Sequence, residues 1–482
     1  MNLSFAEVTA AVGGKAAAED VQTAFLRFTG VAIDNRKIEG GELFVAIAGE
    51  NSDGNRFAKA ALDAGAVAVL TSNAQIAIEN GAAPERLIVV ADSVLALGKL
   101  AKYWLSYLRQ NSKANLKVIG ITGSVGKTTT KDLLARILTH RGPVVAPPNS
   151  FNNEIGLPLT VLRANLQTAN LILEMGADRV GNIAYLTDIA PLDVSTVLIV
   201  AKAHLGSFGS IENTICEKAQ IIAGTQSDGV AVLNADDPNV VQMAATAECK
   251  VEFFSVNSAQ AEEARKNQDV FAAASEIDAA NGYPQFTLFL GGQHEKLVLG
   301  LAGKHNIANA VAAAAIARIL GVSFADIIRE IANSKPGSPH RMDVREIGKI
   351  LVIDDAYNAN PTSMRAGIAA LGLLGVKYAR RIAVLGQMLE LGPDSEKEHQ
   401  ELLSALLQAD VSELYLVGKG AFALTAFARE AGIKVVEYLT VEPLIAELNQ
   451  VLQPDSAVLF KGSNGTKIWQ AADSVFSKGF NR

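Results

Sequence analysis

The sequence predicts an α/β protein of three domains with largely parallel sheets. Short apolar strands alternate with alanine-rich helical patterns over nearly all of its 482 residues, and this alternation is typical of layered α/β folds. A chain of this length should form two to four domains, at roughly 100–200 residues each. A glycine-rich loop at residues 120–129 also lies between a predicted strand and a predicted helix, the order found in nucleotide-binding domains.

The predicted strands are short apolar or β-branched runs that end at polar or turn-forming residues. Examples are residues 66–71, 87–90, 117–122, 171–174, 197–200, 350–354, 382–385, 413–417 and 457–461.

We place the three domains at residues 1–92, 93–334 and 335–482. The last boundary is the run 335–339, whose proline and glycine residues make a natural linker. The polar, alanine-rich stretch 259–282 is interpreted as a surface excursion of the second domain.

Composition excludes several classes of protein. The net charge of −7 gives no overall positive potential that would attract nucleic acid or anionic lipid. The only cysteines are Cys216 and Cys249, which argues against a disulfide scaffold and a thiolate metal site. We see no signal peptide, and the alanine-rich run 306–317 is too short to span a bilayer. Composition therefore predicts a cytoplasmic protein that neither binds nucleic acid nor inserts into a membrane.

The loop at residues 120–129 is predicted to bind the phosphates of ATP. Its glycines allow backbone N–H groups to point at phosphate oxygens, and the following helix presents the positive end of its dipole. Lys127 can reach the β- and γ-phosphates, and the Thr128 hydroxyl can hold Mg²⁺. The spacing is not standard, because Ile121 stands where the usual motif has glycine. The predicted phosphate-binding residues are Gly123, Ser124, Val125, Gly126, Lys127, Thr128 and Thr129.

Polar residues also follow other predicted strands, where open α/β sheets usually bind ligands. The Glu174 carboxylate could reach a Mg²⁺ ion on the ATP phosphates, or it could be a capping or surface group. His204 follows a strand and Lys218 lies in a predicted helix at residues 211–223, and the residues alone favour structural roles for both. Asp236 and Asp237 could serve a metal or a nucleotide, or make an Asx turn.

Two further groups of polar residues are candidates for ligand binding. The amides of Asn306 and Asn309, at the start of an alanine-rich helix, suit the edge of a purine, although Asn306 could also cap the helix. In the third segment, acid, phenol and amide groups are concentrated in residues 354–360, and polar residues follow two later strands at 385–392 and 461–463.

Taken in this order, the motifs resemble those of the Mur ligase family of peptidoglycan synthesis. The matching blocks extend from Asp34 to Ser463, nearly the whole chain. GITGSVGKTTT resembles the whole family, including its glycine spacing, whereas DDAYNANPTSM and LGQMLELG resemble the member that adds D-alanyl-D-alanine. The resemblance implies an N-terminal UDP-substrate-binding α/β domain, a central P-loop ATPase-like domain with a parallel sheet, and a C-terminal Rossmann-like α/β domain on the acceptor side.

The resemblance also implies roles for individual residues. Glu174 and His204 match magnesium ligands, and Lys218 stands where the family carries a lysine carbamylated by CO₂, which can hold a second Mg²⁺. With Thr128 these form the expected metal set. Asn306 and Asn309 match adenine-side positions. The expected catalytic residues are Lys127, Lys218, His204, Arg341 near the γ-phosphate, and Asp355 near the ribose and the reaction centre.

Substrate-binding residues are implied in all three domains. The block Asp34, Asn35 and Arg36 resembles the element near the uridine nucleotide. The other expected substrate residues are Asn149, Asn152 and Asn153 in the second domain, and Tyr357, Asn358, Asn360, Lys461 and Ser463 on the acceptor side. Three residues depart from the family pattern, namely Asn35, Gln387 and Asn464.

The activity implied is ligation driven by ATP. ATP would phosphorylate the terminal carboxylate of UDP-N-acetylmuramoyl (UDP-MurNAc) tripeptide, and the amine of D-alanyl-D-alanine would attack the acyl phosphate, giving an amide, ADP and phosphate. We expect a monomer whose domains close about the linker at residues 335–339.

Two alternatives within the family are a ligase that adds a single amino acid and a folylpolyglutamate synthase, and the blocks at residues 354–364 and 385–392 argue against both. A P-loop switch or ATPase would turn over ATP without an acceptor and would leave residues 354–361 unexplained. A non-catalytic binding module is disfavoured because the metal-ligand set is intact.

Overall fold

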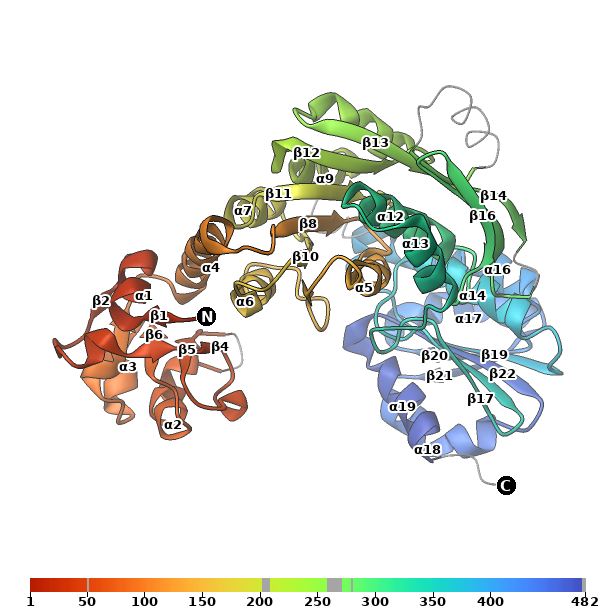
Figure 1. Cartoon of the computed structure of the whole chain (residues 1–482). Helices are drawn as coiled ribbons and strands as arrows, with labels where there is room; N and C mark the ends of the chain where they lie inside the picture. The colour runs from red at the N-terminus through yellow and green to blue at the C-terminus, as the bar shows by residue number, and fades with distance from the viewer. Residues whose placement is uncertain (50–51, 202–208, 258–270, 279–280, 479–482) are drawn as a thin grey trace.

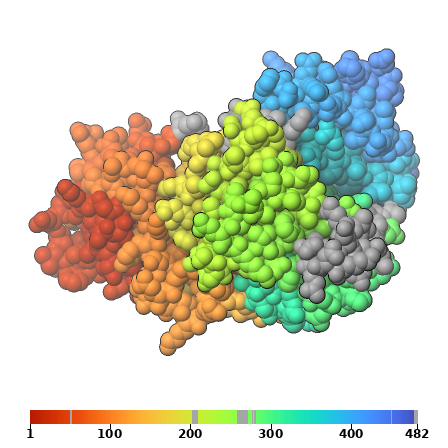
Figure 2. Space-filling model, turned by 90° about the horizontal axis from the view of Figure 1, so that it is seen from above, coloured from red at the N-terminus to blue at the C-terminus, as the bar shows by residue number. Residues whose placement is uncertain are grey.

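The computed structural model describes the chain except residues 50–51, 202–208, 258–270, 279–280 and 479–482. The described residues form three α/β domains with mostly parallel sheets, so the predicted fold class is confirmed (Figure 1). Seen from above, the central domain lies between the N-terminal domain (red and orange) and the C-terminal domain (blue) (Figure 2). No helix in the described part of the chain is long and apolar enough to cross a membrane.

The N-terminal domain is built on a five-stranded sheet of order β2-β7-β6-β5-β4. Its strands are β2 (Lys15–Ala16), β4 (Gly30–Ala32), β5 (Glu42–Ala46), β6 (Ala68–Thr71) and β7 (Leu87–Val89), and only β2 is antiparallel to its neighbour. The domain also contains a separate two-stranded antiparallel sheet, formed by β1 (Leu3–Ser4) and β3 (Arg27–Phe28). One face of the larger sheet packs on α2 (Ala58–Asp63) and α3 (Ala74–Glu79), and the other packs on α1 (Phe5–Val12).

Helix α4 (Ser93–Asn111) connects the first domain to the second. It begins at Asp92, whose Oδ1 accepts hydrogen bonds from the backbone N–H groups of Val94 and Leu95, so the N-terminus of the helix is capped. Its buried side chains belong to one continuous apolar cluster that runs from Leu3 to Met243 and includes residues of both domains. The two domains therefore share a hydrophobic core.

The central domain contains a nine-stranded sheet of order β16-β15-β14-β13-β12-β11-β8-β10-β9. The parallel strands are β8 (Lys117–Thr122), β9 (Val144–Val145), β10 (Asn170–Glu174), β11 (Leu192–Val197), β12 (Thr225–Asn234), β13 (Lys250–Ser255) and β14 (Ala272–Asp278). β15 (Gln285–Leu290) and β16 (Gln293–Val298) are antiparallel. One face packs on α5 (Lys127–Leu138), α12 (Asn306–Ile319) and α13 (Phe324–Ala332), and the other on α6 (Gly156–Arg163), α7 (Asn182–Ile189) and α9 (Ile211–Ala223).

Two sequence predictions in this domain are wrong. The strand expected at residues 197–200 lies earlier in the chain, since β11 ends at Val197. Its polar residue Ser195 can be buried in the strand because Thr225 Oγ1 donates a hydrogen bond to Ser195 Oγ at 2.7 Å. The stretch 259–282 is not wholly a surface excursion, since Ala272–Asp278 forms β14 and Ala272 to Ala274 are buried in the sheet. Burial between two neighbouring strands outweighs the weak strand propensity of alanine. Residues 258–270 lie outside the described part.

The C-terminal domain has a six-stranded sheet of order β17-β18-β22-β19-β20-β21. Its strands are β17 (Asp343–Ile347), β18 (Ile350–Asp354), β19 (Arg380–Gly386), β20 (Glu413–Val417), β21 (Lys434–Tyr438) and β22 (Ser456–Lys461), and only β17 is antiparallel. One face packs on α14 (Pro361–Leu374), α15 (Ser395–Gln400), α16 (Leu403–Gln408) and α17 (Thr425–Glu430), and the other on α18 (Val441–Val451) and α19 (Ile468–Lys478).

Candidate active site

A cavity of about 630 Å³ lies where the central and C-terminal domains meet. The carboxyl ends of β12, β18 and β22 and the loop after β8 open into it, as expected for ligand sites of open α/β sheets. Of the residues predicted from sequence, those that line it are Ser124, Val125, Gly126, Lys127, Thr128, Thr129, Asn152, Asn306, Asn309, Arg341, Asp355, Tyr357, Asn358, Asn360, Lys461 and Ser463.

The loop after β8 leads directly into α5, which begins at Lys127. Gly126 has a φ of 89° and packs so closely on α12 that an added Cβ would lie 2.3 Å from Asn309 Oδ1, so only glycine fits here. Lys127 Nζ donates to the carbonyl oxygen of Gly123 at 2.6 Å, and burial lowers its pKa. Ser124 N–H donates to the carbonyl oxygen of Ile199 at 2.8 Å. The loop is thus held in a fixed shape by its own glycines and its neighbours.

Three polar side chains from different segments meet at the Thr128 hydroxyl. Its hydroxyl lies 3.2 Å from Glu174 Oε2 and 3.0 Å from Ser150 Oγ. Arg341, from the C-terminal side of the linker, donates through Nη2 to Thr128 Oγ1 at 3.1 Å and to Ser150 Oγ at 3.2 Å. The Arg341 guanidinium also stacks over the ring of Tyr357, 4.0 Å from its centroid.

Glu174 has the environment of a metal ligand. The residue is fully buried at the end of β10, and its Oε1 has no hydrogen-bond partner among the described residues. Burial raises the pKa of its carboxyl group, and the charges of Lys131, Lys127 and Arg341 oppose that shift. An unpaired carboxylate oxygen beside a threonine hydroxyl is a donor set that suits Mg²⁺. The residues present therefore fit this ion.

Lys218 lies in α9, whose predicted bounds of 211–223 are confirmed. The side chain is buried, and burial together with the charge of Lys127 lowers its pKa to about 7. A substantial fraction of the amine is therefore neutral at neutral pH, which is the form that reacts with CO₂. His204 lies outside the described residues. Among the described residues, no group of three or more His, Cys, Asp or Glu side chains is arranged to hold a metal.

Asn306 and Asn309 line the cavity as a hydrogen-bonded pair. Asn309 Nδ2 donates to Asn306 Oδ1 at 2.9 Å, and Asn306 Nδ2 donates to the carbonyl oxygen of Ala302 at 2.7 Å. The alternative role of Asn306 as a helix cap is wrong, because α12 has His305 at its N-cap. These bonds fix both amides at the wall of the cavity.

Asp236 and Asp237 make turns and also line the cavity. Asp237 accepts from the N–H groups of Asn239, at the start of α10 (Pro238–Val241), and of Val200. Asp236 accepts from Ser255 Oγ and the N–H of Val256. The Asx-turn interpretation is confirmed for Asp237 by its bond from Asn239, whereas Asp236 bonds to a distant segment.

Several lining residues were not predicted. Leu198, Ile199, Phe254 and Val256 form an apolar part of the cavity wall, and Ser150 contacts Arg341. Leu198 and Ile199 were missed because they were placed inside a strand, whereas β11 ends just before them. The sequence signal that could have identified them as lining residues is an apolar pair directly after a strand.

The buried Lys461 holds the loop after β18. Its Nζ lies 2.5 Å from Asp355 Oδ2 and donates to the carbonyl oxygen of Asn358 at 3.2 Å. Asn360 caps α14 by accepting from Ser363 N–H at 2.9 Å, and its Nδ2 donates across the domain boundary to the carbonyl oxygen of Ser124 at 3.4 Å.

Ser463 accepts from the N–H of Leu389 at 2.9 Å. This bond ties the loop after β22 to the loop after β19, so two lining segments are fixed to each other.

Some predicted residues lie away from the cavity. In the first domain, Asp34 and Arg36 form an ion pair at 2.9 Å, and the hydrogen bonds from Arg36 lower the pKa of Asp34 to about 2. Asn35 begins the short helix Asn35–Lys37 beside them. Asn153 accepts from Gly156 N–H at the start of α6, and Asn149 is exposed.

Two of the residues that depart from the family pattern, Asn464 and Gln387, differ in whether they line the cavity. Asn464 lines the cavity. Gln387 turns away from it, since its Oε1 accepts from the N–H of Gly420 at 3.2 Å.

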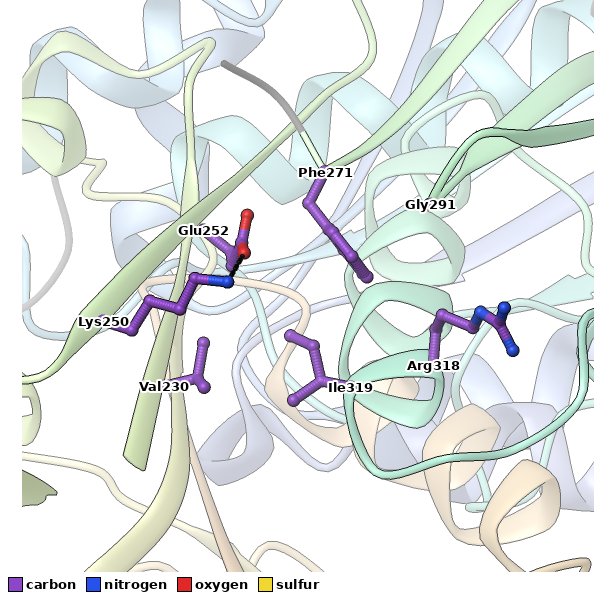
Figure 3. Close-up of a pocket in the computed structure, with 7 residues that line it drawn as sticks. All are labelled: Val230, Lys250, Glu252, Phe271, Gly291, Arg318 and Ile319. Atoms are coloured by element: carbon purple, nitrogen blue, oxygen red, sulfur yellow. Dashed lines mark ion pairs between the residues drawn. The ribbon is translucent and has the colours of Figure 1, made fainter. Parts of the chain in front are cut away.

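A second hollow of about 430 Å³ lies at the amino end of β13, beside Val230 in the middle of β12 (Figure 3). Its charged groups already have partners. Lys250 pairs with Glu252 at 2.6 Å, and Arg318 donates to the carbonyl oxygen of Val322. The ring of Phe271 and the side chain of Ile319 lie between them (Figure 3). This arrangement offers no chemistry comparable to that of the larger cavity.

His340, next to Arg341, provides a pH-dependent prediction. Its Nδ1 lies 2.7 Å from Asp354 Oδ2, and this hydrogen bond raises the pKa of His340. The pair should therefore stabilise the fold fully below about pH 6.5, the ordinary value for histidine, and lose that effect as the pH rises through the higher pKa of the folded state. His340→Asn should lower the unfolding midpoint more at pH 6 than at pH 9.

Asparagine is the substitution of choice because His340 has a φ of 59°, which asparagine tolerates. Thermal unfolding of both proteins from pH 6 to pH 9 measures the difference. A difference that stays constant or grows with pH would rule out the ion pair as its source.

Comparison with known proteins agrees with the resemblance seen in the sequence. Three family models match, described as the Mur ligase family catalytic domain at residues 27–104, the Mur ligase middle domain at residues 121–317 and the Mur ligase glutamate ligase domain at residues 340–464. The three matches cover most of the chain and agree with the site, so the chain belongs to the Mur ligase family.

Similar curated proteins carry one name within that family. UDP-N-acetylmuramoyl-tripeptide–D-alanyl-D-alanine ligase of Mycobacterium tuberculosis is 38% identical, with 98% of each chain covered. The ligase of the same name from Escherichia coli is 32% identical over 95% of this chain and 96% of its own.

Solved structures agree with these relatives. MurF from Acinetobacter baumannii superposes with a TM-score of 0.83 at 30% identity, covering 99% of each chain. MurF from Thermotoga maritima, solved in complex with ADP, has a TM-score of 0.75 at 28% identity, covering 93% of this chain and 97% of that one.

Proposed function

We propose that this chain is an ATP-dependent ligase that joins D-alanyl-D-alanine to UDP-MurNAc-tripeptide and releases ADP and phosphate in peptidoglycan synthesis. One observation carries the proposal, namely the cavity in which the phosphate loop of the central domain faces Arg341, Asp355 and Lys461 of the C-terminal domain. The relatives of that name, which match over nearly the whole chain, support it.

The chemistry has two steps. A carboxylate is a poor electrophile, so a carboxylate oxygen first attacks the γ-phosphorus of ATP, and the bond from that phosphorus to ADP breaks. The dipeptide amine then attacks the carbonyl carbon of the acyl phosphate and loses a proton, and phosphate leaves as the amide forms. Both steps depend on positioning and charge stabilisation more than on covalent help from the protein.

Each half of the cavity supplies groups for these steps. Lys127 and the backbone of the phosphate loop would hold the β- and γ-phosphates, and Arg341, 3.1 Å from Thr128, would neutralise charge that develops on the transferred group. The paired amides of Asn306 and Asn309 and the apolar wall would hold adenine, and Asp355 would lie near the ribose.

Two magnesium ions would complete the site. Thr128, Glu174, His204 and Lys218 as its carbamate would hold them, and bound Mg²⁺ would neutralise phosphate charge. The unpaired Oε1 of Glu174 and the lowered pKa of Lys218 support this assignment.

The tripeptide carboxylate and the dipeptide amine would meet beside the γ-phosphate of ATP, with the two substrates held by residues of different domains. We assign the uridine end to Asp34, Asn35 and Arg36 and the peptide to Asn149, Asn152 and Asn153. On the acceptor side we assign Tyr357, Asn358, Asn360, Lys461 and Ser463.

We further propose a cytoplasmic monomer whose C-terminal domain closes on ATP. The contacts of Arg341 with Thr128 and of Asn360 with Ser124, which are present in this structure, would hold the closed arrangement. Small-angle scattering that showed no compaction with ATP and substrates would contradict closure.

The test is phosphate release from ATP and Mg²⁺ with UDP-MurNAc-tripeptide, with and without D-alanyl-D-alanine, with the products identified by mass. We expect release that requires both substrates and a pentapeptide product. Release that is indifferent to both would overturn the proposal and favour an ATPase that drives a partner.

A further inference from the structure

Lys131 is a buried lysine that has no assigned role in the reaction described above. It lies on α5, one turn after Lys127, and only 3% of it is exposed. Its Nζ donates to the carbonyl oxygen of Pro147 at 3.0 Å and to Ser338 Oγ at 3.3 Å, and it pairs with Asp132 at 2.6 Å. Burying an ammonium group is costly unless it is paired, and here its partners come from three separate segments.

The positions of these partners connect Lys131 to the reaction centre. Pro147 lies three residues before Ser150, and Ser338 lies three residues before Arg341. Ser150 and Arg341 both contact the Thr128 hydroxyl, at 3.0 and 3.1 Å. The Lys131 ammonium group therefore holds both segments, one at Pro147 and the other at Ser338, three residues before each segment reaches Thr128.

The linker packs closely on Asp132, the ion-pair partner of Lys131. An added Cβ at Gly337 would lie 2.9 Å from Asp132 Cγ, so the linker backbone packs directly on the partner of Lys131. The residues on either side of Arg341 are in the left-handed region, with φ values of 59° for His340 and 50° for Met342. Such backbone persists only where the surroundings hold it in place.

Two contacts hold this turn from its two ends. Met342 N–H donates to Asp355 Oδ1 at 3.3 Å on the downstream side, and Lys131 holds Ser338 on the upstream side.

We propose that Lys131 is a positioning residue for phosphoryl transfer. Through Ser338 and Pro147 it sets where Arg341 and Ser150 meet Thr128, without lining the cavity itself. This inference deepens the proposed function and rests on it. A lysine that positions other groups should affect the chemical step and leave nucleotide binding largely unchanged, which separates it from Lys127.

The first test measures steady-state kinetics of the ligase reaction and ADP binding by calorimetry. Lys131→Met should lower kcat roughly tenfold or more, since small misplacements of a reacting group cost up to about a hundredfold, with little change in KM for ATP or Kd for ADP. Ser338→Ala should lower kcat in the same direction by less, and Lys131→Arg should restore part of the loss.

Two matched controls should keep the activity of the unaltered protein. Ser334→Ala removes a buried hydroxyl just before the linker that bonds only to Ile331 O in the structure described. Lys117→Met removes a half-buried lysine at the opposite end of β8, where it pairs with Asp193.

A double-mutant cycle distinguishes positioning from a general structural role. If Lys131 acts through Arg341, then adding Lys131→Met to Arg341→Lys should lower kcat little further, whereas independent effects multiply. Hydrogen exchange should also quicken at the Met342 amide in Lys131→Met and Ser338→Ala, but not in the controls.

Multiplied losses, or an unchanged kcat in Ser338→Ala and Lys131→Met, would overturn the positioning role. If Lys131→Met does not fold, Ser338→Ala alone decides, because it removes a single hydroxyl. Failure of the unaltered protein to form the pentapeptide would instead overturn the proposed function.

Discussion

Replacing Lys127 by methionine is expected to remove nearly all ligase activity. Methionine has similar length but no charge, so the variant loses the cation that would hold the β- and γ-phosphates. Removing one group that stabilises charge in phosphoryl transfer costs on the order of 10³-fold in kcat. Phosphate release with both substrates present measures the loss, and calorimetry with ADP should show weaker nucleotide binding as well.

The fold should survive this substitution. Lys127 is half-buried and burial lowers its pKa, so an apolar side chain of similar shape should not destabilise the domain. The unfolding midpoint of Lys127→Met should match that of the control Lys117→Met. A variant that is well folded yet retains most of its kcat would remove Lys127 from the mechanism.

Lys218→Ala should cause a comparable loss, and this loss should be partly reversible. If Lys218 acts as a carbamate, its substitution removes a carboxylate-like ligand and leaves a cavity, which a small carboxylate such as acetate or propionate can enter. We expect kcat to fall on the order of 10³-fold, as for other groups that stabilise transferred charge, and to recover in part when the carboxylate is added. The unaltered enzyme should lose activity when CO₂ is removed.

Carbon-13 NMR gives a readout that does not depend on activity. Protein equilibrated with ¹³C-labelled bicarbonate should show a carbamate resonance that is absent in Lys218→Ala. Lys131→Met serves as the control, because Lys131 is also buried but already has three partners, so the resonance should remain. A resonance of equal size in Lys218→Ala would contradict carbamylation at this residue.

The parts of the site that could be predicted from sequence are those formed by neighbouring residues. The phosphate loop is local, because its glycines, Lys127 and Thr128 are adjacent in the chain and lie between a strand and a helix that periodicity identifies. The strands β8, β18 and β20 likewise have the bounds that their apolar runs predict.

The contacts between distant segments could not be predicted in the same way. Thr128 and Arg341 are far apart in sequence, and nothing in either local pattern shows that they share a hydrogen bond. Strand β14 was missed because its alanines have weak strand propensity and only their place between two strands explains their burial. Leu198 and Ile199 look like strand residues until the end of β11 is known.

Helix α4 has a consequence for how the molecule can be divided. Its buried face belongs to one apolar cluster that extends from Leu3 to Met243, whereas the clusters of the C-terminal domain include a single buried residue from the rest of the chain, Ala302. Cutting the chain after Asp92 would expose parts of this apolar cluster on both pieces, whereas cutting near the linker would separate a single buried residue, Ala302, from the clusters of the C-terminal domain. Apolar packing therefore joins the first two domains into one unit and leaves the third domain outside it.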